Sequence, residues 1–439
     1  MAGRIGQSAT TLIRRVRSDR RGATAIVFAL GATVFLGLVG LATEGGTWYL
    51  EKRHGQNAAD AAAISGALAL ASQQSGSAAV NTATAIATSN GYTAGTVNGT
   101  TTTVTINYGT YSGGSFTPNT GPNAVRAIVT RSSPRLFSSL FLQNNPNIGE
   151  AAVATVNLLG NPCILSFGQL IIGGDFSSTK GCTIGTNDTN SDAVWFKGVK
   201  GAGAVQANVV SAGGCTGSCD ASKYLYTYQP TATDPFSSQI TSNAVSFPTS
   251  FTGNKCDATP TAYTSTQHAF CGSTWSPATA SLPPGTYVFY TTAISIGNSS
   301  FTCSGCTFVL IDKSNGNGNG TKATISIGGS ATVTLSAPTD TTYPPGLTGL
   351  VIYKPSGSPV NGTNASVSIT GGANVTVSGG IYLPTSDVTV QGNMLGTSAS
   401  GCTEIVAQQV TLTGSATLDL SGCPATTNTT AFQDVKLVN

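Results

Sequence analysis

A single stretch, residues 23–42, constrains the fold of this chain more than any other feature of the sequence. It reads ATAIVFALGATVFLGLVGLA and contains no charged residue. In a helix that rises about 1.5 Å per residue, about 20 apolar residues cross the roughly 30 Å hydrocarbon layer of a bilayer. The stretch therefore predicts one transmembrane helix.

The charges on either side of this stretch predict its orientation. A cluster of arginines opposed only by Asp19 precedes it, whereas the charges that follow it are mixed. The cluster consists of Arg14, Arg15, Arg17, Arg20 and Arg21. By the positive-inside rule, residues 1–22 are a basic cytoplasmic N-terminus, and the chain after about Thr43 is exported.

Two other interpretations of the stretch are open. Gly40 and Ala42 are small residues at the spacing that a signal peptidase accepts, which would fit a cleaved signal peptide. The apolar run is, however, longer than the roughly 7 to 15 residues of a signal sequence. A buried helix of a soluble domain would leave the arginine cluster unexplained. A retained anchor accounts for both the length and the charges.

Small residues recur at every fourth position along the predicted span and form a ridge on one side of it. They are Ala25, Ala29, Thr33 and Gly37. Such a ridge lets another helix approach closely, so it suits packing against a partner span. The alternative is that Ala and Gly are simply common in this stretch.

The composition outside the span is typical of an exported β-rich protein. Only 8% of the residues are charged, and Gly alone accounts for 54 of 439. Beyond the span there are 14 basic and 16 acidic residues, so the positive net charge of the whole chain comes from its N-terminus. This balance gives no nucleic-acid-binding surface. The length allows two or three domains.

Residues 43–160 predict a helical stalk with a small α+β domain. The segment 47–72 is rich in Ala and lacks Pro, so the membrane helix continues beyond the bilayer, with Trp48 and Tyr49 at the outer interface. Strand-like patterns follow near Val104 and over residues 124–130 and 151–159, with a short amphipathic helix over 134–142.

A repeat in the second half of the chain predicts the fold of residues 161–439. Its copies alternate apolar and polar residues around a Gly, and most are spaced by about 21 residues or twice that. They begin at Ile294, Ile325, Val367, Val388 and Val410. Stacked copies form a right-handed parallel β-helix with Ile, Val and Leu inward and Ser and Thr outward, interrupted by an excursion at about 217–284. A β-sandwich is the competing fold.

All 10 cysteines follow the predicted span. An even number in an oxidising compartment is interpreted first as disulfides. Sequential pairing, which the sequence cannot prove, joins Cys163 to Cys182, Cys215 to Cys219, Cys256 to Cys271, Cys303 to Cys306 and Cys402 to Cys423.

The N-terminal sequence resembles a known family. DRRGATAIVFAL at 19–30 and RHGQNAADAAAISGAL at 53–68 resemble the N-terminal region of TadE/TadG-like proteins of the Flp (Tad, tight adherence) pilus-assembly system. The resemblance continues through VRAIVTRSSPRLFSSLF and, more loosely, beyond residue 160. It implies a non-enzymatic accessory protein, anchored in a bacterial inner membrane, whose partners are other pilus-assembly or pilin proteins.

Two departures from the family limit what carries over. Pseudopilin members have a Glu five residues beyond the Gly at which prepilin peptidase cuts, but here Val27 follows Gly22 at that distance. Many TadG proteins also carry a metal-binding Asp-x-Ser-x-Ser motif, which this sequence lacks. We therefore expect neither processing at Gly22 nor metal-dependent adhesion.

The sequence offers little catalytic chemistry. His54 and His268 lack partners at metal-ligand spacing, Cys303 and Cys306 suggest a structural disulfide, and no cofactor site is expected. Acidic residues beyond 160 are scattered, with Asp188 and Asp192 the best candidates for a polysaccharide lyase. An assembly protein is therefore favoured. The rival function is a surface adhesin whose β-helix binds glycan or a host surface.

Overall fold

The computed structural model describes residues 20–438 except 73, 161, 175–176, 179–182, 200–204, 206, 223, 243–246, 249, 264–267, 278–279, 314–319, 340–346, 356–365, 371, 392, 396–402, 414–416 and 420–431. The chain forms two compact units. Unit 1 comprises Met1–Val156 and Val435–Asn439, and unit 2 comprises Asn157–Asp434. The sequence placed the boundary near 160 and assigned the last residues to the second domain. In the structure, Val435–Asn439 instead belong to unit 1.

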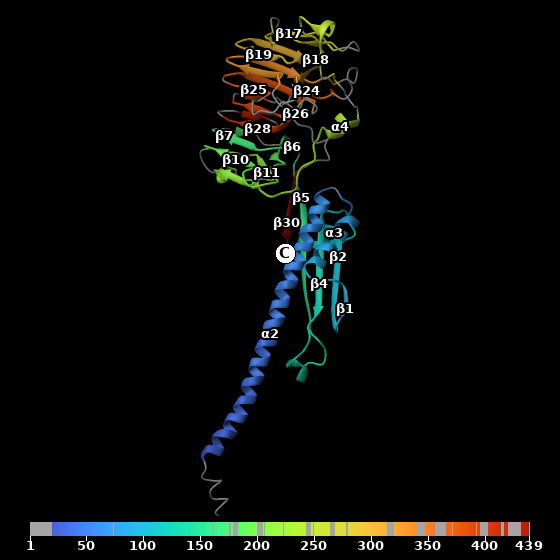
Figure 1. The fold of residues 1–439 in the computed structure, drawn as a ribbon, viewed down its shortest axis with the longest axis vertical. Coiled ribbons are helices and arrows are strands. Elements are labelled where there is room, and N and C mark those ends of the chain that lie inside the picture. The colour runs from blue at the N-terminus through green and yellow to red at the C-terminus, as the bar shows by residue number, and fades with distance from the viewer. Residues whose placement is uncertain are drawn as a thin grey trace, which may run out of the picture. The chain divides into compact units, whose positions relative to one another are not determined.

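Unit 1 is built on one long helix, α2 (Arg20–Ala71), which runs through both the predicted span and its predicted extension (Figure 1). Its first half is apolar and exposed, whereas its Ala-rich second half is largely buried. Among the described residues it is the helix long and apolar enough to cross a membrane. The continuous helix agrees with the absence of Pro after the span.

A second helix and an antiparallel sheet complete unit 1. Helix α3 (Gly76–Ser89) begins at Ser75, whose hydroxyl accepts a hydrogen bond from the Ala78 amide. The sheet has the order β1-β2-β4-β5-β30, with β3 paired to β2. Its strands are β1 (Gly95–Val97), β2 (Thr100–Ser112), β3 (Ser115–Pro118), β4 (Ala124–Ser132), β5 (Asn147–Gly160) and β30 (Phe432–Val438). The expected strands are present, but sequence patterns had not indicated α3.

The predicted amphipathic helix over 134–142 is wrong. The structure has only one turn of 3-10 helix, η1 (Ser138–Leu140), in an otherwise irregular loop. Phe137 lies against Gly40 of α2, but Leu136 and Phe141 are exposed and do not pack on unit 1 as a helical face would.

Unit 2 consists of short strands in two runs, interrupted by η2 (Cys219–Ala221), α4 (Ser237–Ser242) and η3 (Gly253–Lys255). Run 1 contains β6 (Pro162–Ser166), β7 (Leu170–Gly173), β8 (Ser177–Ser178), β9 (Thr183–Thr186), β10 (Val194–Lys197), β11 (Asn208–Ser211), β12 (Cys215–Gly217) and β13 (Leu225–Tyr226). Run 2 contains β14 (Cys256–Asp257), β15 (Ala269–Phe270), β16 (Thr274–Trp275), β17 (Ser281–Leu282), β18 (Gly285–Tyr290), β19 (Ala293–Gly297), β20 (Ser300–Ser304), β21 (Cys306–Ile311), β22 (Thr324–Gly328), β23 (Thr332–Ser336), β24 (Leu350–Tyr353), β25 (Val367–Ile369), β26 (Asn374–Val390), β27 (Asn393–Leu395), β28 (Thr403–Leu412) and β29 (Thr417–Asp419).

The sequence repeat corresponds to a ladder of parallel strands in unit 2. The five repeat starts pair in register from one strand to the next, from Ile294 through Ile325, Val367 and Val388 to Val410. In β19 the apolar Ile294 and Ile296 are buried and Ser295 between them is exposed, as the alternation predicts. Strand pairing among the described strands of unit 2 is parallel, which excludes the antiparallel β-sandwich.

The order of the strands in the stack differs from their order in the sequence. Val410 of β28 pairs with Leu170 of β7, and the ladder continues through Val194 to Cys215 in run 1. Run 1, although earlier in the chain, thus extends the end of run 2. In Figure 1 the red strand β28 accordingly lies beside the green strands β6 and β7.

A strand-poor connection, residues 227–255, links the last strand of run 1 to the first strand of run 2. Its aromatic rings contact tyrosines of three strands of the stack. Phe236 meets Tyr382 of β26, Phe247 meets Tyr353 of β24 and Phe251 meets Tyr290 of β18, with ring centroids 5.6, 6.1 and 5.6 Å apart. The connection therefore runs along the stack as a strap, and its apolar side chains form a second core together with residues of the strands that it covers. The excursion expected at about 217–284 is shorter, since β14 to β17 belong to the stack.

Candidate functional site

One face of α2 packs on the rest of unit 1, and this face begins inside the predicted span. Gly40 is buried, and a Cβ added there would lie 2.5 Å from the Phe137 ring. One turn later the side chain of Glu44 is also buried. The same face continues through Gly55 to Gly66, where an added Cβ would lie 2.8 Å from the Val125 side chain. Small residues thus let the loop and the sheet approach the helix closely.

Glu44 joins the end of the predicted span to the loop between β4 and β5. Its carboxylate accepts hydrogen bonds from the backbone amides of Leu136, Phe137 and Ser138 at 3.0, 3.1 and 2.8 Å. The Ser138 hydroxyl donates a fourth at 2.6 Å. These amides precede and open η1, so the carboxylate caps this turn and satisfies N–H groups that the turn itself leaves free. Glu44 carries no signal of this role in the sequence, because its partners lie more than 90 residues away.

A second polar cluster lies on the same face, two turns further along α2. Arg131 of β4 lies 3.1 Å from the Glu51 carboxylate, which also accepts a 2.7 Å hydrogen bond from the Tyr92 hydroxyl. The guanidinium lies over the Tyr92 ring, 4.2 Å from its centroid. Burial, together with the bond to Glu51, raises the pKa of Tyr92 above its ordinary value. Glu51 and Arg131 also line an open cleft of about 420 Å³.

The small residues of the predicted ridge lie on the exposed part of α2. Ala25, Ala29 and Thr33 are exposed, and no atom lies within 4 Å of a Cβ added at Gly37. The Thr33 hydroxyl bonds to the Leu30 carbonyl of its own helix at 2.8 Å, so it needs no outside partner. Nothing in the described part of unit 1 covers this side of the helix, which leaves it available to another helix.

The described cysteines of unit 2 are all in disulfides. Bonds join Cys215 to Cys219, Cys256 to Cys271 and Cys303 to Cys306, which are three of the pairs that sequential pairing predicts. Cys163 is also disulfide-bonded. The remaining cysteines, Cys182, Cys402 and Cys423, lie outside the described residues.

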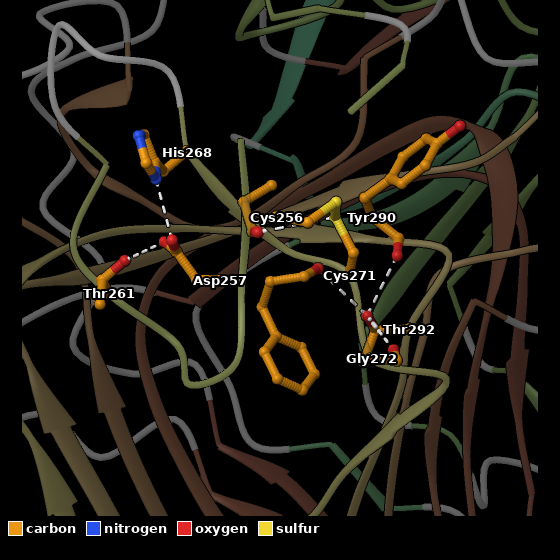
Figure 2. Close-up of a disulfide and its surroundings, with 10 residues drawn as sticks. Cys256, Asp257, Thr261, His268, Cys271, Gly272, Tyr290 and Thr292 are labelled. Atoms are coloured by element: carbon orange, nitrogen blue, oxygen red, sulfur yellow. Dashed lines mark hydrogen bonds and ion pairs between the residues drawn. A yellow bond between two sulfur atoms is a disulfide. The ribbon is translucent and has the colours of Figure 1, made fainter. Parts of the chain in front are cut away.

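Figure 2 shows the Cys256–Cys271 bond, where the strap ends and run 2 begins. Beside it, the His268 imidazole Nδ1 lies 2.8 Å from the Asp257 carboxylate, and the Thr261 hydroxyl donates to the same carboxylate. His268 and Asp257 are 11 residues apart, so spacing in the sequence did not indicate this pair, which the fold around the disulfide brings together. Burial alone would raise the pKa of Asp257, but the hydrogen bonds from Thr261 and His268 outweigh it and lower this pKa.

This cluster and the other predicted candidates do not form a catalytic or metal-binding constellation in the described residues. Asp188 accepts a bond from the Asn190 amide at 3.0 Å, and Asp192 accepts one from the Gln169 side chain at 3.2 Å. His54 is exposed on α2. No group of three or more His, Cys, Asp or Glu residues is placed to hold a metal ion among the residues searched.

A buried ion pair and a half-buried carboxylate of run 2 had no sequence signal. Lys354 lies 2.8 Å from the Asp312 carboxylate, with both side chains almost fully buried. Burial lowers the pKa of Lys354 despite the attraction of Asp312. Glu404 of β28 has one carboxylate oxygen with no partner in the described structure. Burial, with the negative charge of Asp234, raises the pKa of Glu404 to about 8.

Comparison with known protein families matches two segments of unit 1. Residues 22–71 match the family described as Flp pilus-assembly TadE/G-like, and residues 60–154 match the family described as Tad-like Flp pilus-assembly. No curated protein matches the chain. The two matches overlap within α2 and extend into β5, so they cover the helix, the Glu44 and Glu51 clusters and the sheet strands β1 to β4. The resemblance predicted from the N-terminal motifs is confirmed.

Proposed function

We propose that this chain, whose residues 22–154 carry the domains of two Tad families of Flp pilus assembly, is an accessory protein that helps to build a Flp pilus and does not act as an enzyme. The proposal rests on one observation: the matched residues 22–154 fall within unit 1. The two matches together span nearly all of α2, all of α3 and the strands β1 to β4, and they end within β5. A bacterial inner membrane then holds α2, with the N-terminus cytoplasmic and unit 2 periplasmic or surface-exposed, in accord with the arginine cluster.

In the pilus machinery, the small-residue ridge of α2 is proposed to pack against the span of another assembly protein or pilin. Its exposure supports this role, because an apolar helix in lipid gains stability from close contact between small residues. The Gly37→Leu variant adds bulk on the ridge, and Gly31→Leu adds the same bulk at an exposed position on another side of the helix. We expect the first to reduce piliation and the second to leave it unchanged.

Unit 2 is proposed to be a right-handed parallel β-helix stapled by disulfides. The parallel in-register ladder from Ile294 to Val410 supports the fold. The bonds between Cys256 and Cys271 and between Cys303 and Cys306 support the stapling. Such a stack buries a continuous core while each coil contacts only its neighbours.

Deletion of the gene, with complementation by the full chain, tests the assembly role. We expect the deletion to abolish or shorten Flp pili and the full chain to restore them. Reporter fusions at each end test the orientation. The mature N-terminus of membrane-extracted protein tests retention: an intact arginine cluster supports a permanent anchor, whereas a start at Thr43 would contradict it.

A second candidate function, adhesion through unit 2, is favoured by an ordered surface of hydroxyl groups. Ser300 and Thr302 of β20 are exposed and pair in register with Thr332 and Thr334 of β23. Regular hydroxyl rows suit a glycan or host-surface ligand. Glycan-array binding by the full-length protein in detergent, together with normal piliation after deletion, would favour this function over assembly.

A further inference from the structure

The loop between β4 and β5 exposes large apolar side chains that unit 1 does not use. In this segment, called the apolar loop (residues 134–142), Leu136 is 69% exposed and Phe141 77% exposed. Phe137 and Leu142 are partly exposed beside them. Single exposed apolar residues are common on soluble proteins, but four in one short loop mark an interaction surface.

The conformation of the apolar loop is fixed. The amides of Phe141 and Leu142 donate to the Ser138 carbonyl at 2.9 and 2.7 Å. Arg135 donates through Nε to the Asn145 side chain at 2.9 Å and through Nη1 to the Leu142 carbonyl. The loop is thereby closed on itself, with Leu136 and Phe141 held outward.

The loop is also held at a defined height on α2. Phe137 contacts Gly40, and Glu44 accepts the amides of residues 136–138. Gly40 and Glu44 flank Ala42, the last residue of the expected span. With a rise of about 1.5 Å per residue, each lies about 3 Å along the helix from that end. The apolar loop therefore lies level with the outer boundary of the hydrocarbon layer that α2 would cross.

The charges around the loop suit a lipid surface. No acidic residue occurs between residues 132 and 149, and the one charged residue there is Arg135. The Glu44 carboxylate, which contacts the loop, is buried under four hydrogen bonds. Apolar side chains flanked by a cation match the boundary between acyl chains and anionic headgroups.

We propose that the apolar loop is a second membrane contact: Leu136, Phe137, Phe141 and Leu142 insert into the outer leaflet of the bilayer that α2 crosses. This inference rests on the proposed anchoring of α2. We assign lipid, and not a protein, as the partner of the loop, because the loop lies beside the end of the span and is fixed at its level. The inserted loop fixes the rotation of α2 about its axis and holds the strands of unit 1 against the membrane.

Fluorescence quenching in nanodiscs tests the proposal with the full-length protein. Tryptophan replaces Phe141 in the loop, Val97 at a matched exposed position of unit 1 (71% exposed), or Phe28 within the span. The nanodiscs contain phosphatidylcholine and phosphatidylglycerol, with or without brominated acyl chains. We expect bromination to quench the added emission of F141W and F28W at least twofold more than that of V97W.

The outcomes separate this inference from the anchoring on which it rests. Quenching of F28W alone would support the anchor and overturn the loop insertion. Absence of quenching at both positions would contradict the anchor itself. Protection of F141W from aqueous acrylamide in native membranes, without quenching by brominated lipid, would show that a protein covers the loop and would overturn the lipid assignment.

A positioning variant provides an independent readout. Glu44→Ala removes the carboxylate that fixes the loop on α2 but leaves every apolar side chain of the loop in place. In the F141W background we expect this change to reduce the quenching at least twofold, while quenching of F28W is unchanged. Equal quenching of F141W with and without Glu44 would show that the tether does not set the insertion depth.

Discussion

Val410 of β28 and Leu170 of β7 pair in register in neighbouring parallel strands, although one belongs to the last strands of the chain and the other to the first strands of unit 2. Beside them, Ile405 of β28 pairs with Ile164 of β6. The stack of unit 2 is therefore continuous only because the end of run 2 docks on the start of run 1. Stacked repeats gain much of their stability from such interfaces between neighbours.

Because Ile405 lies at this junction, we expect Ile405→Ala to destabilise unit 2 strongly. Ile405 is 1% exposed, and truncating a buried Ile removes apolar contacts and leaves a cavity. We expect a loss of about 2–5 kcal/mol in the free energy of unfolding of unit 2, measured by urea denaturation with circular dichroism. Ser326→Ala on the exposed side of β22 serves as the control and should change stability by less than about 0.5 kcal/mol. Equal midpoints would contradict the docking of the two runs.

Glu404 predicts a pH dependence of the stability of unit 2. The pKa of its carboxyl is about 8 in the folded chain against 4.5 for the group in water, so the folded state binds the proton more tightly than the unfolded state. Stability is therefore highest below about pH 4.5 with respect to this group and falls as the pH rises toward 8. Glu404→Gln removes this dependence, whereas Asp220→Asn on the surface keeps it. Melting temperatures between pH 5 and 9 check the prediction, which fails if the wild type and Glu404→Gln give parallel curves.

Loss of the Cys256–Cys271 bond is expected to lower the free energy of unfolding of unit 2. The bond closes a loop over a sequence separation of 15, for which restriction of the unfolded chain stabilises a protein by about 3 kcal/mol. The double variant Cys256→Ser and Cys271→Ser should lower the stability of unit 2 by about this amount. Breaking the Cys303–Cys306 bond, with its separation of 3, should cost less, because the loop is shorter. Thermal unfolding of the two double variants makes the comparison, and an equal loss in both would argue against loop closure as the cause.

The Glu44 tether predicts a change in local protection without global unfolding. Without the carboxylate, the amides of Leu136, Phe137 and Ser138 lose their acceptor. We expect faster hydrogen exchange over residues 134–142 in Glu44→Ala, measured by mass spectrometry in detergent. Lys52→Ala, which removes a largely exposed side chain of the same helix, is the matched control. Exchange that accelerates across all of α2 instead would indicate that Glu44 supports the whole unit.

Periodicity predicted those parts of the fold in which local pattern and tertiary packing agree. The apolar run before Thr43 gave the helix, and the alternation around Ile294, Ile325 and Val367 gave strands that stand in register in the structure. Alternation works there because every copy buries the same side of its strand.

Features that depend on partners distant in the sequence were not predictable in this way. Gly173 and Gly198 follow Leu170 and Val194 much as Gly follows the repeat starts, but the residues between them do not alternate apolar and polar, so the pattern did not indicate the docking of the two runs. The apolar residues of 134–142 suggested a helix, but Glu44 holds their amides in one short turn. The pairing of His268 with Asp257 likewise depends on the fold around a disulfide.

The place at which the chain leaves and re-enters unit 1 has a genetic consequence. The chain leaves through β5 and returns through β30, and these two strands are neighbours in one sheet. Unit 2 is therefore an insertion between two neighbouring strands of one sheet. A short connection between the two strands in place of unit 2 would leave α2 and the sheet of unit 1 in one continuous chain. Residues between β5 and β30 can therefore be exchanged or lengthened without altering α2 or the pairing of the other strands of unit 1.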